Sequence, residues 1–142
     1  MLTLAFGVFL SFTRIASAAD LPPVLTAAFN VSGPLHPGKS GAVTVSFTAL
    51  KDYAIDRMLP ISLKLNPVPG VTLPKTEIKA SSEDPKSKDG YYVDLPTLRI
   101  PLTVSKAGKY EIPAKLTYFF CSEKDGFCSR QTLDVNIPVT AQ

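Results

Sequence analysis

Between Tyr110 and Phe120 every second residue is apolar, and this is the longest of five such runs along the chain. Because successive side chains of a strand point to opposite faces, this alternation predicts a strand with one buried face. The shorter runs have the same period, and no segment sustains the period of a helix. The pattern therefore predicts an all-β fold, with the shorter strands at 43–47, 61–65, 98–104 and 133–139.

Thirteen prolines and eight glycines break these runs into short segments joined by turns. A length of 142 residues with 45% hydrophobic content is enough for one packed core. We therefore expect a single domain over residues 19–142, an antiparallel β-sandwich of the immunoglobulin-like type. Residues 79–90 are almost free of apolar side chains and are expected to form an exposed loop. Pro101, Pro113 and Pro138 lie within predicted strands, which places them at sheet edges or bulges.

The first residues of the chain have a different pattern from the rest. Leu2 to Phe12 is an apolar stretch, and Ala16-Ser17-Ala18 supplies the small residues of a signal-peptidase site, although no basic residue precedes the stretch. The stretch is shorter than the roughly 20 residues that cross a bilayer as a helix. We predict that residues 1–18 are a signal peptide and that the rest of the chain is exported and soluble after cleavage.

Charge and motif patterns argue against two classes of ligand. The formal net charge of +3 is small and scattered, which is not typical of a nucleic-acid surface. The segment Gly33 to Ser40 matches the spacing of a phosphate-binding loop, but Pro34 and Pro37 lack the N–H groups that would hold phosphate. A β-patterned run follows it instead of a helix. We interpret the segment as the turn that joins a strand near Phe29 to the strand at 43–47, and we expect no nucleotide binding.

The only histidine, His36, lies in that turn without a carboxylate or cysteine beside it. A lone histidine of this kind is most often a solvated turn residue. It supports neither a metal site nor a Ser-His-Asp triad. The sequence therefore predicts no cofactor and no bound metal.

The two cysteines, Cys121 and Cys128, flank a polar loop that follows the longest predicted strand. Asp125-Gly126 within this loop suits a turn that needs positive φ. The cysteines are thus expected to face each other across the mouth of a β-hairpin. Cross-strand neighbours lie near the roughly 5.5 Å Cα separation that a disulfide prefers, so a bond between them is sterically plausible.

Two interpretations of this pair remain open on the residues alone. A structural disulfide that closes eight residues contributes only about 2.5 kcal/mol in the chain-entropy model, and less where the hairpin is already formed. A disulfide at an exposed tip is accessible to an attacking thiolate, as exchange chemistry requires. The first interpretation describes a non-catalytic immunoglobulin-like binding or assembly module, and the second a redox protein.

The region from Leu98 to Val139 resembles the second half of the N-terminal periplasmic domain of the thiol:disulfide interchange protein DsbD. The resemblance rests on the strand 99–104, the turn at Gly108, the strand ending at Tyr118 and the cysteine pair preceded by Gly126-Phe127. It implies an immunoglobulin-like fold, a periplasmic location and a redox role for both cysteines. It also implies electron transport as a component of a protein-disulfide reductase. The expected partners are thiol or disulfide proteins, with a membrane-embedded thiol transporter on another polypeptide as the donor.

The sequence departs from the family pattern around the cysteines. One more residue separates them than is usual, and Ser129-Arg130-Gln131 replaces the prolines that commonly follow the second cysteine. Family members cover the disulfide with an upstream aromatic side chain. Here Tyr91 or Tyr92 could do so, or both could be core residues. Similarly, four aromatic residues of the hairpin could shield the pair or contact a partner, or could simply alternate between core and surface: Tyr118, Phe119, Phe120 and Phe127.

The redox interpretation makes two predictions of its own. The reduction potential is expected to lie well above the roughly −300 mV that is typical of structural disulfides. A Cys128→Ala variant is expected to trap a mixed disulfide with a partner through Cys121.

Overall fold

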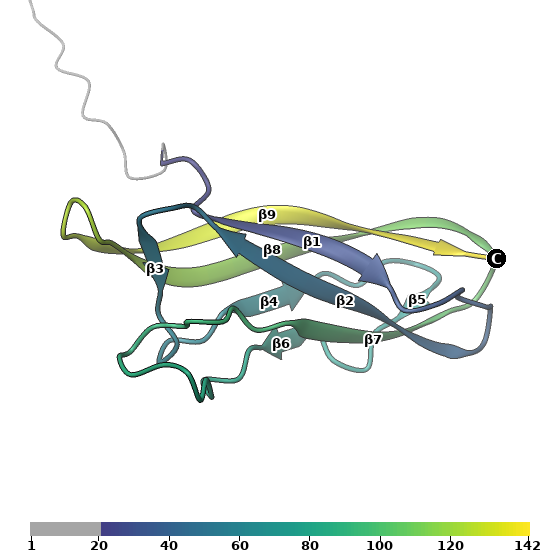
Figure 1. The fold of residues 1–142 in the computed structure, drawn as a ribbon. Coiled ribbons are helices and arrows are strands. Elements are labelled where there is room, and N and C mark those ends of the chain that lie inside the picture. Colours follow the sequence, from purple (N-terminus) through teal and green to yellow (C-terminus); the bar gives the residue numbers. More distant parts are fainter. Residues whose placement is uncertain (1–20) are drawn as a thin grey trace, which may run out of the picture.

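A computed structural model of the chain describes residues 21–142 and shows two β-sheets packed face to face (Figure 1). The predicted signal peptide lies outside the described residues. No helix within residues 21–142 has the length and hydrophobicity needed to span a bilayer. The strands are β1 (Leu25–Val31), β2 (Ser40–Ala49), β3 (Tyr53–Ile55), β4 (Ser62–Leu65), β5 (Val71–Thr72), β6 (Glu77–Lys79), β7 (Leu98–Val104), β8 (Gly108–Ser122) and β9 (Cys128–Ala141).

All strand pairs in both sheets are antiparallel. One sheet has the order β1-β2-β7-β5. In the other, which we call sheet B, β8 is central: β9 pairs along one side of it, while β4 and β3 pair in succession along the other. Strand β6 adds to the outer edge of β4. The predicted all-β, immunoglobulin-like sandwich is confirmed.

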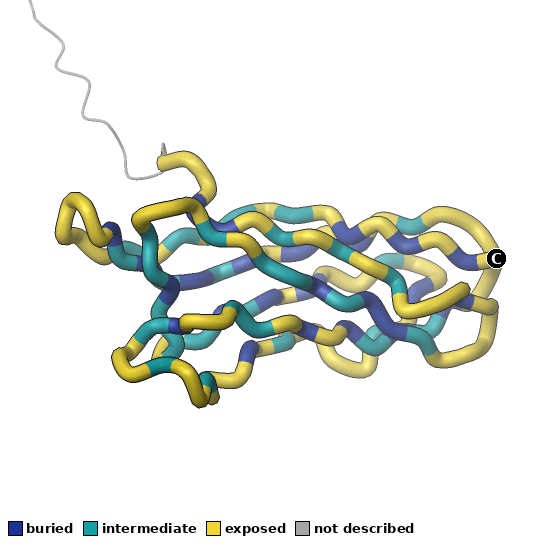
Figure 2. The backbone as a smooth tube through the Cα atoms, in the orientation of Figure 1, coloured by how far each residue is buried: buried dark blue, intermediate teal, exposed yellow. Residues whose placement is uncertain are grey.

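The alternation in the sequence becomes the inner face of each sheet. Along β8, Ile112, Leu116 and Phe120 are buried, while Glu111 and Lys115 at alternate positions are exposed. In Figure 2 buried and exposed positions alternate in the same way along the long strands. Burial of these apolar side chains between the sheets supplies the main stabilisation of the fold. The three strands that the sequence did not predict, β3, β5 and β6, are only two or three residues long.

The three strand prolines follow the prediction in part. Pro138 lies in β9, which has a neighbouring strand on one side only. Pro101 and Pro113 lie in β7 and β8, which are internal strands, so the prediction of edge strands was wrong for them. Both residues lie beyond the last residue pair of a short neighbour, β5 or β4. Each proline therefore has a paired strand on one side only, which is how it fits within a sheet.

The segment 32–39 joins β1 to β2 as a turn, as the sequence predicts. Gly33 and Gly38 both have positive φ, and the Gly38 N–H donates to the Val104 carbonyl oxygen at 2.8 Å. The His36 Nδ1 atom lies 3.3 Å from the backbone oxygen of Gln142. This turn lies at the end of the sandwich opposite to the β8–β9 hairpin tip (Figure 1).

Candidate functional site

The β8–β9 ladder pairs Gly108 with Ala141 at one end and Cys121 with Cys128 at the other. The two cysteines form a disulfide, with their Cα atoms 4.0 Å apart. In the next pair toward the tip the Ser122 N–H donates to the Phe127 carbonyl oxygen at 2.7 Å. Hydrogen-bonded and non-bonded pairs alternate, so the cysteines occupy a non-hydrogen-bonded pair, where strands approach more closely. The predicted hairpin disulfide is confirmed, and the separation is shorter than expected for this reason.

The loop that follows the disulfide is held by backbone hydrogen bonds. Gly126 has a φ of 68°, as the sequence predicts, and its N–H donates to the Ser122 carbonyl oxygen at 3.0 Å. The Asp125 N–H donates to the Ser122 hydroxyl at 3.0 Å. The Glu123 N–H donates to the carbonyl oxygen of Asp52 in the β2–β3 turn at 2.9 Å. The hairpin tip is therefore fixed to the adjacent turn of the sandwich.

The disulfide lies on the outward face of sheet B, in a hollow of about 380 Å³ that we call the disulfide hollow. Cys128 is exposed, whereas Cys121 is half-buried. An attacking thiolate must approach a sulfur along the axis of the S–S bond, and the sulfur of the more exposed residue, Cys128, is the expected target. The hollow is lined by Asp56, Leu59, Tyr91, Phe119, Phe120, Cys121, Cys128, Ser129 and Arg130.

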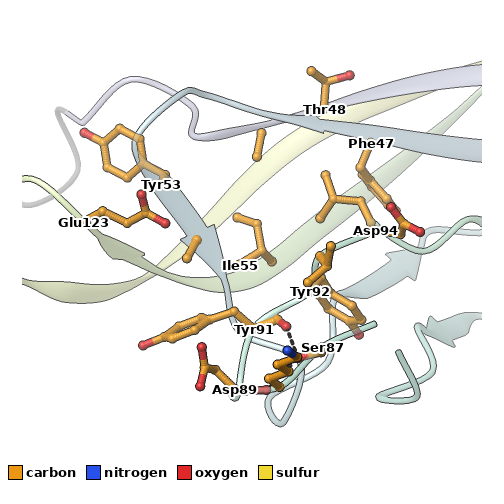
Figure 3. A pocket seen from close by; sticks show the side chains of 15 residues that line it. Phe47, Thr48, Tyr53, Ile55, Ser87, Asp89, Tyr91, Tyr92, Asp94 and Glu123 are labelled. Carbon is orange, nitrogen blue, oxygen red and sulfur yellow. Dashed lines mark hydrogen bonds between the residues drawn. The ribbon is translucent and has the colours of Figure 1, made fainter. Parts of the chain in front are cut away.

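Tyr91 and Tyr92 have different positions. The Tyr91 hydroxyl donates to the Sγ atom of Cys121 at 3.2 Å and lines the disulfide hollow. Tyr92 belongs to the core, and its hydroxyl donates to the Ser81 carbonyl oxygen at 2.6 Å. Burial raises the pKa of the Tyr92 phenol. The two rings point to opposite sides of the chain (Figure 3). Of the two tyrosines, it is therefore Tyr91 that contacts the disulfide.

Arg57, which follows β3, binds the loop that carries Tyr91. We call residues 81–94 the Tyr91 loop. The Arg57 Nε atom donates to the Ser87 hydroxyl at 3.1 Å and to the Asp89 carbonyl oxygen at 3.0 Å, and its Nη1 atom donates to the Ser82 carbonyl oxygen at 3.0 Å. One side chain thus satisfies three acceptors of an irregular segment. The segment expected to be an exposed loop is irregular, but it is closely tied to β3.

Asp84 joins the two ends of the Tyr91 loop. Its Oδ2 atom accepts from the N–H groups of Val93, at 2.6 Å, and Asp94, at 3.2 Å, and its Oδ1 atom accepts from Lys86 N–H at 3.0 Å. Desolvation acts to raise the pKa of Asp84, but hydrogen bonds from these backbone groups and Ser87 lower it below the ordinary value of 3.8. The ionised carboxylate therefore closes the loop beside Tyr91.

The four aromatic residues of the hairpin divide between core and surface. Tyr118 and Phe120 are buried on the inner face of β8. Phe119 points outward and lines the disulfide hollow. Phe127 is 37% exposed and packs edge-on against Phe120, with ring centroids 6.1 Å apart. Phe119 and Phe127 are thus the two that are accessible beside the cysteines.

Four residues of the disulfide hollow were missed by the sequence reasoning: Asp56, Leu59, Ser129 and Arg130. Arg130 follows Cys128 by two positions, so strand alternation alone would have placed it on the same face. Asp56 and Leu59 come from the segment after β3, which the sequence does not mark as a strand. Asp56 Oδ1 accepts from Leu59 N–H at 3.0 Å and from Met58 N–H at 2.7 Å, which shapes this wall of the hollow.

Tyr91 also forms part of a second hollow, a groove of about 790 Å³ between β3 and the Tyr91 loop. Figure 3 shows this groove, with Tyr53, Asp89 and Glu123 near one end of it. We call it the acidic groove because its charged residues are Asp89, Asp94, Glu123 and a single lysine, Lys88. Tyr91 therefore stands between the acidic groove and the disulfide. Across residues 21–142 no three metal-ligating side chains gather at one place.

No family model and no curated protein matches the chain. Among solved structures, the chain is similar to the reduced N-terminal domain of DsbD from Neisseria meningitidis, with 20% identity and a TM-score of 0.48 over 89% of this chain and 94% of that one. The chain is also similar to a cohesin module of a family 33 glycoside hydrolase from Clostridium perfringens, with 12% identity and a TM-score of 0.42 over 84% of this chain and 98% of that one.

Proposed function

We propose that this domain performs thiol–disulfide exchange with protein partners through Cys121 and Cys128. The observation that carries the proposal is the environment of the bond. The Cys128 sulfur belongs to an exposed residue, whereas the Cys121 sulfur accepts a hydrogen bond from the Tyr91 hydroxyl at 3.2 Å. The proposed target of attack is therefore the Cys128 sulfur, and the proposed leaving group is the Cys121 thiolate, which the Tyr91 hydroxyl stabilises.

A purely structural role explains the position of the bond poorly. It joins the last pair of a ladder that is already aligned from Gly108–Ala141 onward, and both strands belong to the same sheet. The closed loop of eight residues corresponds to only about 2.5 kcal/mol in the chain-entropy model. Because the rest of the β8–β9 ladder also holds the two strands in register, the contribution of the bond to stability is expected to be smaller.

The proposed reaction proceeds in two exchanges. A donor thiolate attacks the Cys128 Sγ atom, the S–S bond breaks, and its electron pair remains on Cys121 as a thiolate. The donor's second thiolate then attacks the donor sulfur of the mixed disulfide and releases Cys128 as a thiolate. The donor leaves as a disulfide, and the domain carries two electrons to a downstream disulfide. Arg130, which lines the same hollow, provides a positive charge near both thiolates.

Single-cysteine variants test the proposal. Since Cys128 is the accessible sulfur, Cys121→Ser is expected to trap a mixed disulfide with oxidised glutathione, and Cys128→Ala to react more slowly. The structure thus favours Cys121→Ser as the trapping variant, whereas the sequence analysis chose Cys128→Ala. Mass spectrometry of the adducts over time measures both rates.

The reduction potential separates the two classes of function. Equilibration of the wild-type protein with glutathione is expected to give a potential well above about −300 mV. Two results together would contradict exchange. In the first, glutathione fails to reduce the wild-type bond; in the second, Cys128 of the Cys121→Ser variant reacts no faster than a cysteine in an unstructured peptide. The function would then be that of a non-catalytic binding module.

The hydroxyl of Tyr91 has a separate expected effect. In the reduced protein, Tyr91→Phe removes the hydrogen bond to Cys121, so the Cys121 thiolate loses a donor and the pKa of that thiol is expected to rise. Reduction by a small thiol is expected to slow as well, because Cys121 becomes a poorer leaving group. Ultraviolet absorbance of the thiolate against pH measures the pKa. Tyr92→Phe is the matched control and leaves this pKa unchanged; an unchanged pKa in Tyr91→Phe would remove Tyr91 from the mechanism.

We further propose that residues 1–18 direct export and that residues 19–142 act as one domain in the periplasm. An exported location supports this chemistry, because a disulfide persists outside the reducing cytosol. A membrane-embedded thiol transporter is the proposed donor. Amino-terminal sequencing of the protein recovered from a periplasmic fraction tests the cleavage after Ala18.

A further inference from the structure

The outward face of sheet B extends from the disulfide toward a row of cations. Strand register pairs Cys121 with Cys128, then Phe119 with Arg130, Thr117 with Thr132 and Lys115 with Asp134, all on one face because alternate residues of a strand share a face. Beside them, β4 adds Ser62 and Lys64, and β6 adds Glu77 and Lys79. We call this surface the cationic face.

A shallow hollow of about 420 Å³ runs along the cationic face. Leu59, Phe119 and Arg130 line both this hollow and the disulfide hollow. The two hollows are therefore adjacent, so a polypeptide bound at the sulfur atoms has a neighbouring hollow to enter along β8. The threonine and serine hydroxyls of the face add hydrogen-bonding groups, of which Thr117 and Thr132 lie 3.1 Å apart.

The charges of this face do not cancel. Lys115 pairs with Asp134 at 2.8 Å and Lys79 pairs with Glu77 at 3.6 Å. Lys64 and Arg130 form no ion pair within the described part of the chain. The cationic face therefore has a net positive charge, while the acidic groove on the other side of Tyr91 has more carboxylates than lysines.

Exposed apolar side chains gather at the same end of the sandwich. The β2–β3 turn, the segment after β3, the Tyr91 loop and the hairpin tip all lie there (Figure 1). These side chains offer apolar surface for contact with another protein at the end that carries the disulfide. Each of the large exposed apolar residues within 21–142 belongs to this end: Leu21, Leu50, Met58, Leu59, Val93 and Phe127.

We infer that the cationic face binds an extended acidic segment that flanks the reactive cysteine of the partner protein. This inference rests on the proposed function and specifies its substrate class. The thiol of the partner cysteine attacks Cys128, and an apolar residue beside that cysteine contacts Leu59 and Phe119. Carboxylates farther along the segment pair with Arg130 and then with Lys64. Lys64 lies in register with Lys115, six residues before Cys121, so a segment must extend roughly 20 Å, about six residues, to reach it.

Three synthetic peptides test the inference. Each has a single cysteine followed by six residues that are acidic, neutral or basic. Each peptide attacks the wild-type disulfide, and its rate of attack is divided by its rate with 2-hydroxyethyl disulfide, a small neutral disulfide, to remove intrinsic thiol reactivity. At low salt the acidic peptide is expected to exceed the basic one by about tenfold, because complementary charge accelerates encounter. At 1 M salt, where the Debye length is about 3 Å, the difference is expected to disappear.

Charge variants locate the effect. Lys64→Gln is expected to slow the acidic peptide by about threefold without changing the rate of a small neutral thiol. Because Arg130 also lies beside the thiolates, the double variant Lys64→Gln with Arg130→Gln is compared with the same neutral thiol, and relative to it the acidic peptide is expected to slow by about tenfold. Lys109→Gln, at the far end of β8 and roughly 40 Å from Cys121, is the control and is expected to have no effect. The inference would be overturned if the wild type prefers acidic peptides and these variants do not reduce that preference. It would also be overturned if the wild type prefers basic peptides, because the acidic groove would then be the binding surface for the flanking segment.

The two proposals fail in distinguishable ways. If small thiols reduce the disulfide readily and the three peptides react alike, the charge inference is wrong and the exchange function stands. If no thiol reduces the bond faster than it reduces oxidised glutathione and the bond resists the glutathione pool, the exchange function is wrong.

Discussion

A Tyr118→Ala variant is expected to be less stable than the wild type by about 4 kcal/mol, close to the whole stability of many small domains. The Tyr118 ring is fully buried between the sheets, in contact with Phe120. Its hydroxyl accepts from the N–H groups of Val24, at 3.1 Å, and Leu25, at 3.0 Å, and donates to Gln131 Oε1. One side chain thus fills the core and connects the start of β1 to the β8–β9 hairpin.

Tyr118→Phe separates the two contributions. It keeps the ring but leaves the buried Leu25 N–H without its side-chain acceptor, whereas the Val24 N–H keeps Gln131 at 3.1 Å. The expected loss is about 2 kcal/mol, the usual cost of one unsatisfied buried donor. Urea unfolding monitored by circular dichroism measures both variants. Tyr110→Phe, whose exposed hydroxyl donates to the Lys106 carbonyl oxygen, is the control. A Tyr118→Phe midpoint equal to that of the control would show that the hydroxyl adds no net stability.

An Asp84→Ala variant is expected to release the Tyr91 loop while the sandwich remains folded. The Val93, Asp94 and Lys86 amides lose their common acceptor, and their hydrogen exchange is expected to accelerate by an order of magnitude or more. As Tyr91 leaves Cys121, the sulfur atoms become more open on that side. Hydrogen exchange by mass spectrometry over residues 81–94 measures the release. Asp89→Ala removes a carboxylate of the same loop that accepts none of these bonds, so it is the matched control.

Acidification is expected to have the same effect as the Asp84→Ala substitution. The folded-state pKa of Asp84 lies below its ordinary value of 3.8, so its carboxylate contributes fully above pH 3.8. The contribution is lost as the pH falls through the lowered folded value. Exchange in the Tyr91 loop is therefore expected to rise steeply only below pH 3.8 after correction for intrinsic exchange rates, and Asp84→Ala is expected to lack this rise. A loop that opens equally in both proteins at low pH would contradict this role of Asp84.

The fold was largely predictable because the long strands have strong alternation. The runs at 98–104 and 110–120 correspond closely to β7 and β8, since one buried face dictates the residues at every second position. Strands β3, β5 and β6 were missed because two or three residues are too few to show a period. They exist through pairing with distant residues, as in the register of Tyr53 with Ser122.

The candidate site was predictable only where it is local in sequence. The hairpin disulfide follows from two cysteines around an Asp-Gly turn, and Arg130 follows from alternation. The choice between Tyr91 and Tyr92 depends on Arg57 and Asp84, which position the Tyr91 loop through contacts with backbone groups up to 32 residues away in sequence. No local pattern encodes such contacts, because any carbonyl or N–H group can provide them.

The position of the cysteines at the end of a long ladder also has a consequence for the redox equilibrium. Oxidation, reduction, folding and unfolding form a closed thermodynamic cycle. If the disulfide adds little to the free energy of unfolding, folding therefore adds equally little to the free energy of forming the disulfide. The register from Gly108–Ala141 to Phe120–Ser129 holds the strands in either state. We therefore expect the midpoint potential to lie close to that of the same cysteine pair in an unfolded chain, shifted mainly by the local contacts of each sulfur. Such a domain can be reduced and reoxidised repeatedly at nearly constant structure.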